Sequence, residues 1–271
     1  MADFAVPGYR RNIGTPGSTD RLARPKPLSV FDLFTVGIGP SSSHTVGPMR
    51  AAAAFTTELT ELTGRLESVA RVTVDLYGSL AATGAGHGTM NAVLVGLEGT
   101  LPDLVTPAEL ATASTRIEKD GAVLLGGVRP VPLRASDLAL HPREVLARHS
   151  NGMTFAAFSD DGELIAASTY FSIGGGFIER EGSADSAAGS TPEAEEPLPF
   201  STAVELLEHC ARESIGFSEV MLRNELPRRS EAEVRAGILH IRDVMEECKN
   251  NALVRDGDLP GTLRVRRRAP A

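Results

Sequence analysis

A serine-rich segment around a histidine is the first part of the sequence whose residue types could do chemistry. Ser41, Ser42, Ser43, His44 and Thr45 follow a Gly-Pro pair and precede a segment with helical spacing of apolar residues. The first turn of a helix has unpaired N–H groups and about half a positive charge, so hydroxyls placed there can help to hold a carboxylate or phosphate. The histidine can transfer a proton near neutral pH. The structural alternative is an elaborate helix cap with a solvated histidine; we favour a site.

A glycine-rich segment with a second histidine stands at residues 84–89, GAGHGT, which we predict to be a loop between a strand and a helix. Glycines permit the positive φ angles and the close backbone approach that a ligand cradle needs. His87 is a second candidate for proton transfer, and Gly88 and Thr89 are candidates for binding. The alternative is an ordinary glycine-rich turn. We expect the two histidine segments to meet at one edge of an open sheet, where ligands bind.

A third candidate is the run Ser172–Ile178, which ends a predicted strand with three glycines. Its backbone amides could face an anion, or a neighbouring chain could pack closely against it. The alternative is a hinge into the segment that follows, and the sequence does not decide between them.

The elements around these segments predict a mixed α/β fold. Alternating apolar and polar residues over 69–77 predict a half-buried strand. Thr106-Pro107-Ala108-Glu109 combines a cap, a first-turn proline and an acid, which predicts a helix to about Ile117. Strands are predicted over 153–158 and 164–173, joined as a hairpin by Asp160-Asp161-Gly162. A helix is expected over 46–63, and Ser29-x-x-Asp32 resembles a capping box.

Composition divides the chain into four parts. Residues 1–27 are predicted to be a flexible lead-in, and residues 28–180 an α/β domain. Residues 181–199 lack large apolar residues except one leucine, as in a linker or mobile loop. Residues 200–271 are predicted to be helical, with helices capped at Thr202, Ser218 and Ser230, and to be the start of a truncated helical domain.

The overall charge and hydropathy exclude several functional classes. The 27 basic and 35 acidic side chains give a net charge of −8, which argues against nucleic acid or anionic lipid as a partner. No apolar stretch reaches the roughly 18 residues of a membrane span, and the first residues lack a secretory signal, so a cytoplasmic protein is expected. The basic run near the end, 263–268, is a weak signal for nucleic acid and is interpreted as a solvated end or a truncation point.

The cysteines and lysines restrict the cofactors. Two thiols, Cys210 and Cys248, cannot supply the usual four ligands of a zinc or iron–sulfur site, and we expect both to be buried as small apolar residues. The three lysines, Lys26, Lys119 and Lys249, offer no attractive Schiff-base candidate, so pyridoxal phosphate is not expected.

Several strings of the sequence together resemble a known family. They are SVFDLFTVGIGPSSSHTVGPMRAA, YGSLAATGAGHGT, NGMTF, STYFSIGGGFI and LPGTLRVRRRA, in order from about residue 29 to 268. They resemble the iron–sulfur-dependent L-serine dehydratases (L-serine ammonia-lyases) in their single-chain form. The resemblance implies conversion of L-serine to pyruvate and ammonia, with a 4Fe-4S cluster as Lewis acid.

The resemblance also implies a domain organisation. It predicts an α/β serine dehydratase β domain, similar to the small allosteric substrate-binding domain of some phosphoglycerate dehydrogenases, followed by the start of a helical catalytic domain. His44 and His87 become the candidate catalytic residues. The cluster cysteines are expected beyond Ala271, so no metal or cluster is expected in this chain, which alone should be inactive. The partners implied are L-serine, the remaining catalytic α domain in cis or in trans, and a second copy in a homo-oligomer. The candidate substrate-binding residues are Ser41, Ser42, Ser43, Thr45, Gly88 and Thr89.

Two rival functions remain open at this point. The chain could be a non-catalytic regulatory module that binds serine or another amino acid, because a related fold does not prove catalytic activity. A phosphate-handling enzyme is disfavoured, since the sequence has no GxxxxGK[ST] motif and no lysine near either histidine segment.

Overall fold

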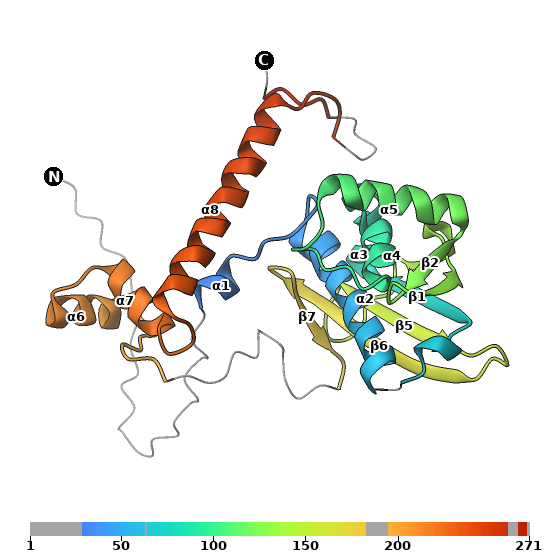
Figure 1. Ribbon diagram of the computed structural model, residues 1–271, viewed down its shortest axis with the longest axis horizontal. Coiled ribbons are helices and arrows are strands. Elements are labelled where there is room, and N and C mark those ends of the chain that lie inside the picture. Colours follow the sequence, from blue (N-terminus) through green and yellow to red (C-terminus); the bar gives the residue numbers. More distant parts are fainter. Residues whose placement is uncertain (1–28, 63, 183–194, 260–264, 270–271) are drawn as a thin grey trace, which may run out of the picture.

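The computed structural model describes residues 29–62, 64–182, 195–259 and 265–269. Within these ranges an α/β part runs to Arg180, and a helical part follows it (Figure 1). The predicted fold class is thereby confirmed. The predicted lead-in, 1–27, and most of the predicted linker, 183–194, lie outside the described residues, as do the first two residues of the basic run, 263 and 264.

Five strands form one mixed sheet in the order β4-β1-β5-β6-β7. Strand β1 is parallel to β4 and antiparallel to β5, and the β5–β6 and β6–β7 pairs are antiparallel. The predicted hairpin is confirmed as β5 and β6. A separate two-stranded sheet contains β2 and β3. The bounds are β1 Arg71–Tyr77, β2 Ala122–Leu125, β3 Arg129–Pro132, β4 Ala139–His141, β5 Gly152–Phe158, β6 Leu164–Gly174 and β7 Phe177–Arg180.

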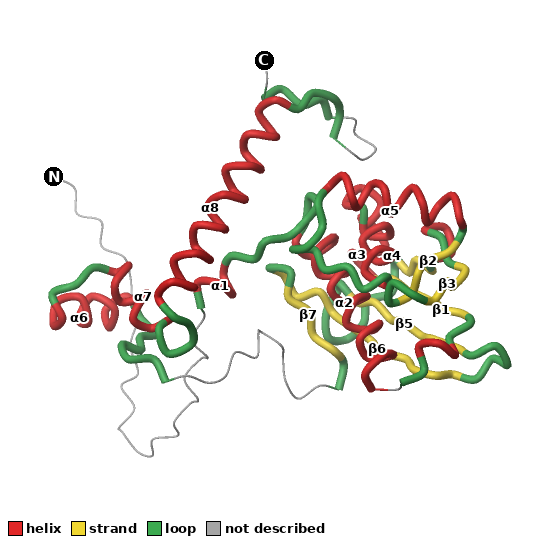
Figure 2. Tube along the Cα trace, in the orientation of Figure 1, coloured by secondary structure: helices red, strands yellow, loops and turns green. Residues whose placement is uncertain are grey.

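Helices α2, α3, α4 and α5 lie to one side of the sheet (Figure 2). Helices α2 and α3 contact the strands, α4 packs on α2, and α5 packs on α4 and β2. The predicted capping box of α5 is present, with Thr106 as N-cap, Pro107 in the first turn and a left-handed Gly121 at the end. The bounds are α2 Gly47–Thr57, α3 Gly78–His87, α4 Thr89–Leu97 and α5 Pro107–Asp120.

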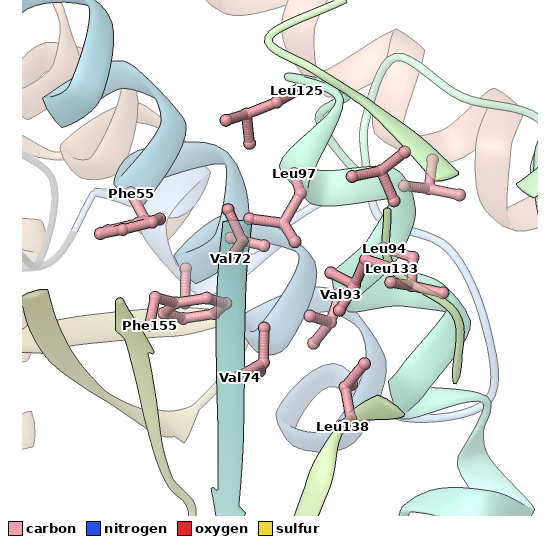
Figure 3. Close-up of a cluster of buried hydrophobic side chains, with 14 of the residues drawn as sticks. Phe55, Val72, Val74, Val93, Leu94, Leu97, Leu125, Leu133, Leu138 and Phe155 are labelled. Atoms are coloured by element: carbon pink, nitrogen blue, oxygen red, sulfur yellow. The ribbon is translucent and has the colours of Figure 1, made fainter. Parts of the chain in front are cut away.

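Aromatic and aliphatic side chains fill the space between the helices and the sheet (Figure 3). Phe55 of α2 stacks on Phe155 of β5 with ring centroids 5.4 Å apart. Val72 and Val74 of β1 point into the same cluster, as the predicted alternation of this strand requires. Full burial of each such side chain stabilises the fold by roughly 1.5–3 kcal/mol. This core holds α2 and α4, whose amino-terminal ends carry the candidate site.

A glycine permits the close approach of α2 and α4. A Cβ atom at Gly96 would lie 2.4 Å from the carbonyl oxygen of Met49 and 2.9 Å from the Cβ of Ala52. Only a residue without a side chain lets the two helices pack at this distance. The start of α2 and the start of α4 are therefore held in a fixed relation.

The helical part consists of α6 Ala203–Glu213, α7 Phe217–Glu225 and α8 Glu231–Val254. A short helix from the amino-terminal side, α1 Val30–Leu33, packs against it (Figure 1). The buried carboxylate of Glu225 accepts a hydrogen bond from the Val30 amide at 3.1 Å, and the Arg229 guanidinium lies over the Phe31 ring at 4.6 Å. The capping boxes that begin α1, α6 and α8 agree with the predictions.

Two predictions for this helical part are wrong. The N-cap of α7 is Gly216 and not Ser218, because the chain is already extended at the glycine and the serine lies inside the first turn. The cysteines are not buried: Cys248 is exposed and Cys210 is half-buried. Both stand on helices that turn much of their surface to solvent in the described structure, and Val234 is the sole residue of α8 that is buried there.

Candidate active site

The serine-rich segment is a helical turn and not a loop. A π-helical turn, Ser42–Val46, leads directly into α2, so helical structure begins four residues before the predicted start at Val46. The reason is the cap: the Ser41 hydroxyl accepts a hydrogen bond from the His44 amide at 3.1 Å, and the Ser41 carbonyl accepts from the amide of Thr45 at 3.0 Å. Such wide turns are frequent at functional sites.

The glycine-rich segment also differs from its prediction. Residues 84–87 are the last residues of α3, so the predicted loop over 84–89 is wrong except at Gly88, which has φ of 68° and separates α3 from α4. Gly84 is buried against Thr89, where a Cβ atom would lie 3.0 Å from the threonine side chain. His87 therefore stands at the carboxyl end of a helix, and Thr89 begins the next one.

The structure brings these two segments together, as expected. The Thr45 hydroxyl donates to the His87 carbonyl at 2.8 Å, and the Thr89 hydroxyl donates to the His44 carbonyl at 2.5 Å. Both threonine side chains are buried. The two imidazole centroids lie 4.9 Å apart, with the rings inclined by 43°. Thr45 and Thr89, predicted to bind substrate, thus use their hydroxyls to hold the two histidine turns against each other.

Two serines hold the ring of His44. The Ser43 hydroxyl lies 2.9 Å from Nδ1, and the Ser79 hydroxyl lies 3.0 Å from Nε2. Burial lowers the pKa of His44, and the neighbouring His87 lowers it further, while the Ser79 backbone acts in the opposite direction. His44 is therefore a neutral imidazole at neutral pH, the form that can accept a proton.

The ring of His87 is oriented by its own helix. Its Nδ1 lies 2.9 Å from the Thr83 carbonyl oxygen, one turn earlier in α3. A carbonyl can only accept, so Nδ1 carries the proton and the lone pair of the neutral ring is on Nε2. Within the described residues no hydrogen bond reaches that Nε2 atom. The half-buried His87 thus presents an unengaged basic nitrogen.

The predicted serines differ in their surroundings. Ser41 is used as the helix cap, and its Oγ lies 3.4 Å from that of Ser43. Ser42 is exposed, and so is Gly88 at the other segment. Ser42 and the first amides of its turn are thus the groups of this segment most open to a ligand.

Ser79 is a residue that the sequence analysis missed. It follows Gly78, whose φ of 51° makes the tight connection from β1 to α3, and a Cβ atom on that glycine would lie 2.5 Å from the Ser150 carbonyl oxygen. The Ser79 amide donates to the same Ser150 carbonyl at 3.0 Å. The strand followed by Gly-Ser predicts a turn but gives no sign that its hydroxyl reaches His44.

The triple-glycine run proves to be a hairpin turn, so its interpretation as a hinge is wrong. Gly174, Gly175 and Gly176 all have positive φ and join β6 to β7. The turn packs beside the histidine segment: a Cβ atom on Gly176 would lie 2.7 Å from the Val46 side chain. The run therefore packs against the histidine segment of the same chain, while close packing of a neighbouring chain and binding of an anion by its amides stay predictions.

A pocket of about 300 Å³ lies between α1, α2 and this hairpin turn. Its lining includes the Arg50 side chain, which donates to the Gly176 carbonyl at 3.0 Å. Arg50 lies six residues after His44 and is a cation that the sequence analysis did not single out.

No metal site is found among the described residues, since no group of three or more histidine, cysteine or acidic side chains is suitably placed there. Cys210 and Cys248 are free thiols on different helices. In the same ranges no helix has both the length and the apolar character needed to cross a membrane.

The α/β domain with its interlocked histidine turns is that of a known class. Residues 29–183 match the model of the family described as serine dehydratase beta chain. The L-serine dehydratase of Mycobacterium tuberculosis is 52% identical over 242 residues, which are 89% of this chain and 52% of that protein. That of Streptomyces coelicolor is 44% identical over 245 residues, and L-serine dehydratase 1 of Escherichia coli 41% over 246; they cover 89% and 90% of this chain and 53% of each relative.

The chain belongs to the L-serine dehydratase family, which confirms the resemblance found in the sequence. It spans about half the length of the curated relatives it matches.

Proposed function

We propose that a protein formed by this chain and the remaining half present in its relatives is an L-serine ammonia-lyase, which converts L-serine to pyruvate and ammonia. The names of the relatives support the substrate and the class of reaction. The observation that carries the proposal is the close approach of His44 and His87, whose ring centroids lie 4.9 Å apart although the residues are more than 40 positions apart in the sequence. Hydrogen bonds from the hydroxyls of Thr45 and Thr89 hold the two segments together.

Removal of the α-proton of an amino acid needs a nearby base and stabilisation of the negative charge that develops. The histidine pair supplies the base, because the lowered pKa of His44 favours its neutral imidazole, and Nε2 of His87 has no partner among the described residues. The exposed Ser42 hydroxyl and the first amides of its helical turn are placed to hold the substrate carboxylate.

The family resemblance implies a 4Fe-4S cluster, but the described residues do not fit one. A cluster needs four thiolates or their equivalents. Cys210 and Cys248 lie on α6 and α8 and form no group with further ligands in the described ranges. We therefore propose that the cluster ligands belong to sequence outside this chain.

The helical part supports a proposal about the remaining half. Large apolar side chains of α8 are exposed, among them Ile238, Leu239 and Met245, at 46%, 47% and 51%. A helix with such a face is normally covered. We propose that the rest of the catalytic α domain covers it, in cis or in trans. A homo-oligomer and a cytoplasmic location remain predictions.

The second candidate function is a regulatory module that binds serine without catalysis. It is favoured by one observation: this chain contains the complete histidine pair but no set of cluster ligands among its described residues.

Calorimetry and a pyruvate assay separate the two functions. The longer protein, reconstituted anaerobically with iron and sulfide, should form pyruvate from L-serine, and this chain alone should form none. Binding of L-serine to this chain without pyruvate formation by either protein would support the regulatory module. About four irons bound to this chain alone would contradict the assignment of the ligands to other sequence.

A further inference from the structure

Helix α1 lies against the helical part, although it precedes the α/β part in the sequence (Figure 1). The amide of Val30, its first residue, donates to Oε1 of Glu225 on α7 at 3.1 Å, and the two residues are 195 positions apart. The Glu225 side chain is 2% exposed, and its Oε2 accepts from the Arg229 guanidinium at 2.9 Å. A buried carboxylate is stable only when hydrogen bonds or a counter-charge satisfy its oxygens. The α1 amide satisfies one oxygen of Glu225, and Arg229 satisfies the other.

The Phe31 ring of α1 packs on α8 at a position without a side chain. A Cβ atom at Gly237 would lie 2.5 Å from Cε1 of Phe31 and 2.9 Å from its Cζ. The Arg229 guanidinium lies over the same ring, 4.6 Å from its centroid. A glycine inside a helix costs about 1 kcal/mol relative to alanine, and here the packing of Phe31 gives it a structural reason.

The segment that connects α1 to the histidine turn, residues 34–41, packs tightly on that turn. A Cβ atom at Gly37 would lie 2.6 Å from Cγ2 of Val46. At Gly39, whose φ is 83°, it would lie 2.5 Å from Cγ2 of Thr45. The connecting segment and the histidine turn are therefore one packed unit, and the place where α1 docks also determines where this unit lies.

We infer that α1 is a docking helix that sets the position of the histidine turn relative to the helical part, with Glu225 as the positioning residue that holds it there. Within the described ranges, the hydrogen bond from Val30 to Glu225 is the one that joins the helical part to residues 29–182. From α1 the contacts continue through Thr45, whose hydroxyl donates to the His87 carbonyl at 2.8 Å. The docking itself does not depend on the proposed function, but its importance for catalysis rests on it.

A helix as short as α1 reports its own docking. Isolated helices of fewer than about 12–15 residues are marginal in water, and α1 has 4 residues. The amides of Asp32 and Leu33 donate to the Ser29 carbonyl and that of Phe34 to the Val30 carbonyl, at 3.0 or 3.1 Å. Slow hydrogen exchange of these three amides therefore requires that α1 is held by the helical part.

The substitution Val30→Pro removes the donated N–H and keeps the helix start. Val30 is the first helical residue, where proline is favoured, and Ser29 before it has φ of −68° and ψ of 151°, which a following proline permits. In the 271-residue chain we expect the three α1 amides to be protected in NMR exchange experiments. Val30→Pro should speed their exchange at least about 10-fold, since a hydrogen bond to a charged group is lost. Val30→Ala keeps the amide and should keep the protection, and the amides of β5 should exchange as in the parent in both variants.

Glu225 is tested in the same assay. Glu225→Ala should release α1 as Val30→Pro does, whereas Glu225→Gln retains an acceptor oxygen for the Val30 amide and should restore most of the protection. In the longer protein Val30→Pro should lower kcat for L-serine by at least about 10-fold, because small misplacement of reacting groups is costly. Ser136→Ala, on an exposed turn, is the control for kcat and should leave it unchanged.

Three results would overturn the inference. Exchange of the α1 amides in the parent at the rate of an unfolded segment would show that α1 is not docked. Protection that survives both Val30→Pro and Glu225→Ala would show that this contact does not hold it. Parental kcat in Val30→Pro with α1 released would show that docking does not position the histidine turn. Because exchange needs no substrate or cluster, a protected α1 in a chain whose longer form makes no pyruvate would refute the proposed function alone.

Discussion

Substitution of Gly47 by alanine tests how the histidine turn is seated on the sheet. Gly47 is the first residue of α2, and its φ and ψ of −59° and −52° are open to any residue. An added Cβ atom would nevertheless lie 2.0 Å from the Oγ of Ser172 and 2.8 Å from its Cβ. Ser172 is fully buried on β6, and its Oγ has no hydrogen-bond partner among the described residues.

The cost follows from this contact. Real Cβ contacts do not fall below 3.0 Å, so the two atoms at 2.0 Å must separate by about 1 Å in a close-packed region. Forcing an extra methyl group into such a site destabilises a protein by about 1–3 kcal/mol. The backbone conformation contributes no strain. We therefore expect Gly47→Ala to lower the free energy of unfolding by this amount.

The measurement is urea denaturation followed by far-UV circular dichroism, because the chain has no tryptophan. Gly86→Ala is the matched control: it is also a helical glycine near the site, but a Cβ atom there meets nothing within 4 Å. That control should be stabilised by about 0.5–1 kcal/mol, the usual gain for alanine over glycine in a helix. The same chemical change should thus have opposite signs at the two positions.

A second substitution locates the clash. Ser172→Gly removes both offending atoms, and the next nearest atom to a Cβ at position 47 is the Ser42 carbonyl oxygen at 3.5 Å, an ordinary contact. In the Ser172→Gly background Gly47→Ala should cost little, which gives a coupling energy of at least about 1 kcal/mol. Equal stability of Gly47→Ala and the parent would refute the reasoning, as would an effect of Gly47→Ala that is independent of residue 172.

Three further predictions concern charge and thiol reactivity. Burial lowers the pKa of His44 in the folded chain, so its contribution to stability is present above the pKa of the unfolded chain and is lost as the pH falls through the folded pKa. A hydrogen bond to the Asp75 carboxylate raises the pKa of His141, so its contribution is present below the pKa of the unfolded chain and is lost as the pH rises through the folded pKa. An NMR titration should therefore show His141 titrating above His44, and the reverse order would be contradictory. Glu58→Gln should lower the free energy of unfolding by about 1–3 kcal/mol, because the hydroxyls of Ser168 and Tyr170 and the guanidinium of Arg180 bind this carboxylate. An unchanged urea midpoint would show that these three contacts do not stabilise the fold. Under native conditions Cys248 should react with a thiol reagent faster than the half-buried Cys210, and equal rates would show that α8 is covered.

The elements that the sequence predicted are those with local causes. The hairpin at Asp160-Asp161-Gly162, the alternation in β1 and the capping box of α5 each depend on residues within a few positions, so neighbours in sequence suffice. The expectation that the His44 and His87 segments meet came from their places beside predicted strands and at helix starts, because such segments gather at one edge of an open sheet.

The features that the sequence did not predict depend on tertiary packing. Glycines at positions 84 and 86 predicted a loop, but packing of Gly84 on Thr89 keeps that segment helical up to His87. The role of Ser79 needs a strand, a glycine turn and a second segment to be in place at once. The exposure of Cys248 reflects what stands beside α8, which helical periodicity does not report.

The most direct test of the account is the turnover of L-serine by the longer protein after His44→Gln and His87→Gln, with Ser136→Ala as control. A positioned general base contributes about 10²–10⁴-fold to a rate. We predict a loss of at least about 100-fold for His87→Gln, a measurable loss for His44→Gln and an unchanged rate for the control. Parental turnover in both histidine variants would contradict the claim that the two interlocked turns form the proton-transfer site.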